Sequence, residues 1–115
     1  MKVYLIDPFA RTVSEGELAA LNELDLLRSI YALLKCETIE AVRPLNSGVD
    51  IMYVDEDGLA GEQQAFFFCR LFPQVIAGRA LWIGTTPDGG NCSPEMTLEY
   101  VRDHVVWNPS FDPLR

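Results

Sequence analysis

The sequence predicts an α+β fold: a mostly antiparallel sheet covered by about two helices, in a single compact domain spanning residues 1–115. Three observations support this prediction. Short β-like runs alternate with turn residues along the chain, an amphipathic helix pattern follows Asn22, and a second helix signal begins at Ser93. A length of 115 residues suits one domain with its own core.

The first elements are expected to be a β hairpin and a helix. Residues 3–6 form a short β run that an Asp-Pro pair ends, and residues 11–18 alternate as an exposed partner strand. Asn22 is the expected N-cap of the helix, with Asp25 in capping-box position. We expect this helix to end at about Lys35 and to cover one face of the sheet, which leaves the other face for a groove or a partner. Its predicted apolar stripe comprises Leu24, Leu27, Ile30, Tyr31 and Leu34.

A second hairpin and a buried strand follow. Residues 38–42 and 49–54 are predicted to pair around an Asn-Ser-Gly turn, and residues 80–83 form a core strand entered through Gly78. The aromatic run at residues 66–72 is apolar enough to be buried, but its periodicity fits helix and strand equally well. Residues 86–91 are rich in turn residues.

The last helix is predicted to start at Ser93, as its N-cap, with Pro94 in the first helical position. Leu98, Val101 and Val105 would then share one face of it. The C-terminal residues 107–115 contain two prolines and are expected to pack as extended chain.

The densest charge lies in residues 49–61, where an apolar strand delivers Asp55, Glu56 and Asp57 into a glycine turn. With Asp50 and Glu62, residues 50–62 contain five acids and no Lys or Arg. A solvated hairpin turn, a contact surface for a protein and a Ca²⁺ site are all open interpretations. Contiguous acids do not match a calcium loop, where acids alternate, and we expect no metal site.

The chain is strongly acidic, with a net charge of −8, and the charge is unevenly placed. Residues 1–63 hold twelve of the 17 acidic residues and five of the nine basic ones. Such a surface repels phosphate backbones, so we do not expect nucleic-acid binding, whereas a basic partner protein is allowed. No apolar run is long enough for a membrane span or a signal peptide, and a cytoplasmic location is expected.

Catalytic groups are scarce. His104 is the only histidine, so any serine or cysteine triad of the usual kind would need it. Cys36, Cys69 and Cys92 form no C-x-x-C pair and are expected to be reduced thiols. We therefore predict no catalytic residues and no cofactor.

A second candidate site carries positive charge. Arg70, Gln74 and Arg79 could grip a carboxylate or phosphate, because each guanidinium offers two parallel donors. The alternative is that each arginine pairs with the acidic first half. Nearby aromatic residues also allow a homodimer through residues 66–72 or the C-terminal tail.

Several short segments in order resemble a known family: KVYLIDP, YALLKCETIEAVR, MYVDEDGL, PQVIAGRALWIGT and a following SPE. They are similar to small proteins of unknown function carried by phages, plasmids and some bacteria. The resemblance covers most of residues 1–96 and implies a cytoplasmic protein from a mobile element, without an established active site.

Two functions are therefore expected from different classes. The first is a non-enzymatic binding protein, such as a phage-encoded modulator or inhibitor of a host defence protein, in which Asp55, Glu56 and Asp57 contact a basic surface. The second is a small-molecule binder that sequesters an anionic nucleotide or signalling metabolite near Arg70, Gln74 and Arg79.

Overall fold

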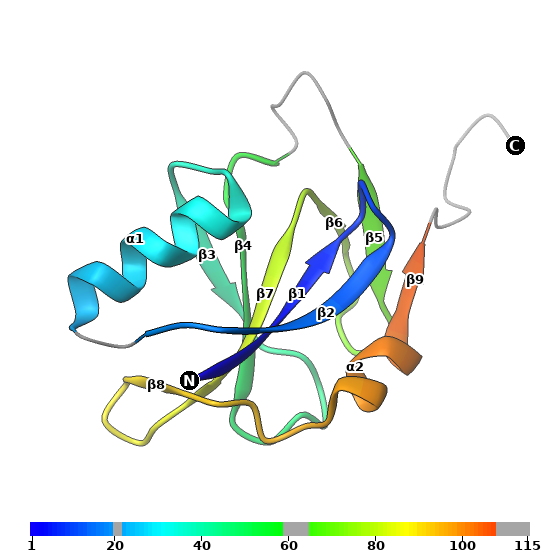
Figure 1. Cartoon of the computed structure of the whole chain (residues 1–115). Helices are drawn as coiled ribbons and strands as arrows, with labels where there is room; N and C mark the ends of the chain where they lie inside the picture. The colour runs from blue at the N-terminus through cyan, green and yellow to red at the C-terminus, as the bar shows by residue number, and fades with distance from the viewer. Residues whose placement is uncertain (20–21, 59–64, 108–115) are drawn as a thin grey trace, which may run out of the picture.

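A six-stranded antiparallel sheet forms the centre of the fold in the computed structural model, which describes residues 1–19, 22–58 and 65–107 (Figure 1). Its strand order is β2-β1-β7-β4-β3, and the short β8 pairs with β7. The strands are β1 (Lys2–Asp7), β2 (Thr12–Glu17), β3 (Ile39–Val42), β4 (Asp50–Asp55), β7 (Ala80–Thr85) and β8 (Asn91–Cys92). The strands β2 and β3 are therefore the two edges of the main path.

A second sheet of three antiparallel strands has the order β6-β5-β9. Its strands are β5 (Phe66–Cys69), β6 (Val75–Ala77) and β9 (Val105–Trp107). Of residues 66–72, whose periodicity left helix and strand undecided, the first four form the strand β5 and the last three belong to the turn that follows it. The helices are α1 (Glu23–Leu34) and α2 (Leu98–His104), and none in the described part of the chain is long and apolar enough to cross a membrane.

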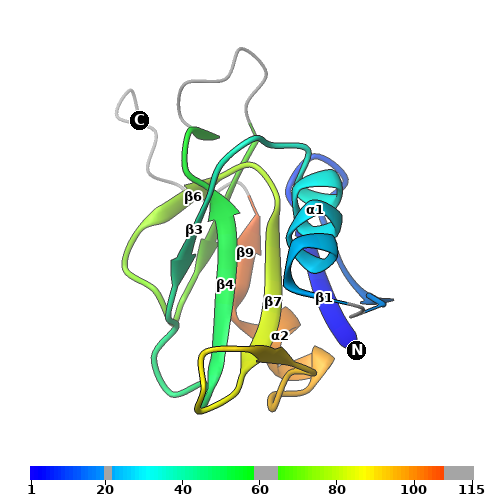
Figure 2. The same ribbon diagram turned by 90° about the vertical axis from the view of Figure 1, so that its left-hand side faces the viewer.

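The main sheet is covered on both faces, as Figure 2 shows, with α1 on one side and the second sheet on the other. Helix α1 packs on Val3, Leu81 and Ile83, while Trp82 and Met52 point to the opposite face. This α+β domain agrees with the predicted fold class. The expectation that the face opposite α1 stays open is wrong, because β5, β6, β9 and α2 cover it.

Both predicted hairpins are confirmed. Strands β1 and β2 pair antiparallel around the turn after Asp7, and β3 pairs with β4 around the turn at Ser47. The start of α1 is also as predicted: Asn22 accepts a hydrogen bond from the Asp25 amide at 2.8 Å, and Lys35 ends the helix with a left-handed backbone.

The predicted apolar stripe of α1 is partly wrong. Leu26, Ile30 and Leu34 are buried, whereas Leu24 is 56% and Leu27 36% exposed. The helix carries two neighbouring apolar rows, so periodicity alone could not decide which row faces the sheet. The row spaced four residues apart packs on the core, and the other is turned toward solvent.

Asp50 is fully buried, although the sequence suggested a place among the surface acids. Its Oδ2 accepts from the Trp82 indole N–H at 2.7 Å and from the Met96 amide at 2.9 Å, and its Oδ1 accepts from the Glu95 amide at 2.8 Å. A buried carboxylate needs such donors to replace its lost hydration. Asp50 thus joins β4, β7 and the segment before α2.

The predicted start of the last helix is wrong. The N-cap of α2 is Thr97, whose side chain accepts from the Tyr100 amide at 3.1 Å. Ser93 instead accepts a hydrogen bond from the Lys2 amide at 2.9 Å. Because the Ser93 hydroxyl is occupied by the Lys2 amide, it does not cap residues 95 and 96, whose amides donate to Asp50 instead. Val105 lies in β9 beyond the helix.

Candidate functional site

The acidic turn follows β4, and two of its three acids hold its backbone in place. The Asp57 amide donates to Asp55 Oδ1 at 2.9 Å, and the Thr38 hydroxyl donates to Asp57 Oδ2 at 3.0 Å. Glu56 is exposed, and its side chain forms neither of these hydrogen bonds. Glu56 is thus the acid of the three whose side chain the turn does not use.

The sequence suggested that this turn is the tip of a hairpin, and this prediction is wrong. Strand β4 pairs with β3 and β7, whereas the next strand, β5, pairs with β6 and β9 in the other sheet. The acidic turn therefore begins a connection between the two sheets. Glu62 and the rest of residues 59–64 lie outside the described residues.

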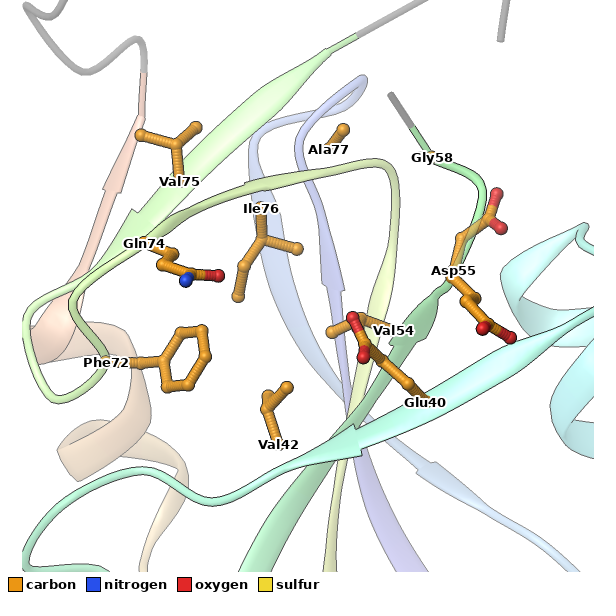
Figure 3. Close-up of a pocket in the computed structure, with 11 residues that line it drawn as sticks. Glu40, Val42, Val54, Asp55, Gly58, Phe72, Gln74, Val75, Ile76 and Ala77 are labelled. Atoms are coloured by element: carbon orange, nitrogen blue, oxygen red, sulfur yellow. The ribbon is translucent and has the colours of Figure 1, made fainter. Parts of the chain in front are cut away.

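A cleft of about 110 Å³ lies beside this turn, between β3 and β4 of the main sheet and β6 of the second sheet. Figure 3 shows the side chains of Glu40, Val42, Phe72, Gln74 and Ile76 pointing into the space between β3 and β6. Buried Val54 and Ile76 contribute apolar walls, and the exposed Glu40 stands at the rim. The cleft thus combines apolar walls with acidic residues on its β3 and β4 side.

The acids that line the cleft form no ion pair within the described residues. Glu40, Asp55 and Glu56 line it, and none takes part in the four ion pairs found within the described residues. Those pairs are Met1–Glu17, Lys2–Glu15, Arg28–Asp25 and Arg79–Asp7. Neighbouring carboxylates that form no ion pair create a negative potential that attracts cationic groups.

Glu40 was not among the predicted site residues. The signal that could have found it is strand alternation: Glu40 and Val42 occupy the same face of β3, and Glu40 pairs in register with Val54 of β4. No group of three or more His, Cys, Asp or Glu side chains in the described ranges is arranged to hold a metal ion.

The second predicted site is not assembled. Arg70 and Arg79 lie beyond opposite ends of the β5–β6 hairpin, because Phe68 pairs with Val75 at one end and Phe66 with Ala77 at the other. The alternative interpretation holds for Arg79, which forms an ion pair with Asp7 at 3.4 Å. Its guanidinium also lies 4.6 Å from the centre of the Phe9 ring.

Arg70 contacts main chain rather than an acidic side chain. Its guanidinium donates to the Asp103 carbonyl at 3.4 Å, and its amide donates to the His104 carbonyl at 2.8 Å. Gln74, the third predicted residue, reaches the cleft together with Glu40 and Glu56 instead of joining the two arginines.

His104 is engaged within α2. Its Nδ1 lies 2.6 Å from the Tyr100 carbonyl, and its ring is 4.5 Å from the Tyr100 ring, centre to centre. In the part of the chain that is described, no serine or cysteine side chain hydrogen-bonds to the imidazole. The arrangement is that of a helix C-terminus and not of a catalytic pair.

The three cysteines are free thiols, as predicted. Burial raises the pKa of Cys69, which is fully buried, and burial together with the nearby Asp55 raises the pKa of Cys36. Raised pKa values reduce the thiolate fraction at neutral pH, so neither side chain has the environment of a reactive nucleophile.

The comparisons with known proteins identify a family and no function. No curated protein and no solved structure is significantly similar to the chain. The expected resemblance to a family of unknown function is confirmed, whereas carriage by phages or plasmids stays a prediction. The model of the family described as "Domain of unknown function (DUF3846)" matches residues 1–105, and the chain belongs to this family.

Proposed function

We propose that the chain is a non-enzymatic binding protein whose acidic cleft, formed by β3, β4 and β6, contacts a basic surface of a partner protein. The observation that carries the proposal is the pair of exposed acids that line the cleft, Glu40 and Glu56, neither of which forms an ion pair within the described residues. The resemblance to proteins of mobile elements favours a host protein, such as a defence protein, as that partner.

The charge arrangement supports a cationic partner over an anionic one. The net charge is −8, and the cleft adds a local concentration of acids. Opposite charges across an interface accelerate encounter and select the partner, while like charges are repelled. A basic protein is therefore favoured at this surface over nucleic acid.

The alternative, sequestration of an anionic nucleotide, receives no comparable support. Arg70 and Arg79 lie at opposite ends of the β5–β6 hairpin, and Arg79 is already paired with Asp7. The acidic cleft holds about 110 Å³, whereas small-molecule sites have about 300–1,000 Å³. It is too small and has the wrong charge for a nucleotide.

The test is affinity capture from a lysate of the natural host, with the wild-type protein and two doubly charge-reversed variants. The first variant carries Glu40→Lys and Glu56→Lys, because these exposed side chains have no role in holding the turn. Asp55 and Asp57 are left unchanged, since both support its backbone. The captured basic protein is then titrated by calorimetry.

The matched control carries Glu15→Lys and Glu17→Lys on β2, at the opposite edge of the main sheet. It changes the net charge by the same amount, and the two glutamates it replaces are solvent-exposed partners of long ion pairs, at 3.5 and 3.8 Å, which contribute little stability. We expect at least tenfold weaker binding for the cleft variant and little change for the control. Equal affinities of the two variants would exclude the acidic cleft as the contact surface.

A further inference from the structure

The outer edge of β3 is open, and this edge adjoins the acidic cleft. Glu56 donates its amide to the Thr38 carbonyl at 3.2 Å, which fixes the hydrogen-bond alternation between β3 and β4. In that alternation the main-chain groups of Ile39 and Ala41 point away from β4. No hydrogen bond to these outward groups is formed within the described ranges. The edge can therefore accept another strand.

The opposite side of the cleft is also a strand edge. Gly78 donates its amide to the Ala65 carbonyl at 2.9 Å, so the main-chain groups of Val75 and Ala77 point away from β5. The two edges are joined at one end of the cleft, where the Leu45 amide donates to the Leu71 carbonyl at 2.7 Å. The opening is therefore a short segment along β3 and not a continuous gap.

At the other end, Gly58 comes close to β6. A Cβ placed on Gly58 would lie 2.6 Å from the Ala77 carbonyl oxygen, so only a residue without a side chain fits at this approach. The cleft volume of about 110 Å³ lies well below the about 300–1,000 Å³ of typical small-molecule sites. This is room for one apolar side chain rather than for a whole small molecule.

We infer that the cleft binds an extended basic peptide segment of a partner, which adds as a strand to β3 and inserts one apolar side chain between β3 and β6. This inference rests on the proposed function. Side chains two residues apart in an extended chain share a face. A segment with Lys or Arg two residues before and after the apolar residue would place cations near Glu40 and Glu56, which line the cleft.

A second copy of the chain fits this edge poorly. Pairing β3 with β3 of another copy would bring two Glu40 side chains, and the acids around them, close together, and each copy carries a net charge of −8. Like charges across paired strands are destabilising. Charge complementarity therefore selects a basic peptide over self-association.

The inference is tested with the capped pentapeptide acetyl-Lys-Thr-Val-Thr-Lys-amide and the folded wild-type protein. Binding is followed by NMR titration and by amide hydrogen exchange. We expect slower exchange of the outward amides of Ile39 and Ala41 when the peptide is bound. We also expect at least tenfold weaker binding when both peptide lysines are replaced by glutamate, and for the protein with Glu40→Lys and Glu56→Lys.

Two N-methylated peptides separate strand addition from simple charge attraction. One carries the methyl group on the valine nitrogen, and the other on both threonine nitrogens. Because alternate N–H groups of an added strand face β3, one analogue should bind at least tenfold more weakly and the other within threefold of the parent. Equal binding of both analogues, with unchanged exchange at Ile39 and Ala41, would overturn the inference.

The two proposals fail in different ways. If the captured basic protein needs Glu40 and Glu56 but the peptide does not bind, the strand-addition inference is refuted and the proposed function stands. If neither the captured protein nor the peptide responds to charge reversal at Glu40 and Glu56, both are refuted.

Discussion

Replacing Asp50 by asparagine tests whether its carboxylate holds the centre of the fold together. The side chain is fully buried and accepts three hydrogen bonds, two at Oδ2 and one at Oδ1. Asparagine has nearly the same shape but only one accepting oxygen. With that oxygen in the Oδ2 position, the amide NH₂ faces the Glu95 N–H, so two donors meet and one hydrogen bond is lost.

The expected magnitude follows from these contacts. Hydrogen bonds to a charged group contribute about 1.5–3 kcal/mol each. Asp50→Asn removes one bond and the negative charge that strengthens the other two, so we expect a loss of about 2–4 kcal/mol in the free energy of unfolding. Asp50→Ala removes all three acceptor contacts, a loss of about 4–5 kcal/mol or more, which approaches the total stability of about 5–15 kcal/mol for a typical domain.

The assay is urea unfolding followed by circular dichroism and by Trp fluorescence. Asp103→Asn is the matched control, since the same chemical change at this exposed position should shift stability by less than about 0.5 kcal/mol. Trp82→Phe, which removes one donor, should lose about 1–3 kcal/mol and couple to Asp50→Asn in a double-mutant cycle. A change below about 0.5 kcal/mol for Asp50→Asn would refute the assignment of Asp50 as a structural anchor.

Three further outcomes are expected. Asn22→Ala should lose about 1 kcal/mol by urea unfolding, because the α1 N-cap bond is removed; no loss would contradict the cap. Gly84→Ala should lose about 1–3 kcal/mol in the same assay, since its Cβ would lie 2.5 Å from the Ser93 carbonyl oxygen. Stability should also fall as pH rises above about 9. Burial raises the pKa of Cys69 above 9.0 and is the main cause that raises the pKa of Tyr4 above 10.0. The unfolded state therefore loses these protons at lower pH than the folded state, which favours unfolding. A flat profile between pH 8.5 and 10.5 would contradict this.

The fold could be predicted largely where local chemistry decides it. The turn residues and alternation around β1 to β4, and the cap at Asn22, act within a few residues, and the structure agrees with them. The start of α2 could not be predicted in this way. Ser93 followed by proline is a good local helix start, but the Ser93 hydroxyl accepts from Lys2, and Asp50, more than 40 residues earlier, accepts from the amides that Ser93 would have capped. Such a contact exists only after β4 and β7 have been brought together.

The acids of the stretch that begins near Asp50 show why charge density alone did not define the candidate site. Asp50 is buried as an acceptor, Asp55 and Asp57 support a turn, and Glu56 is left exposed. Glu40, which lies on another strand and outside that stretch, faces the same cleft. Residues that are contiguous in sequence thus have separate structural roles, while strand pairing joins acids from separate segments. The proposed contact surface depends on the register between β3 and β4 and on the opposing edge of β6. For this reason the decisive variant replaces Glu40 and Glu56 together.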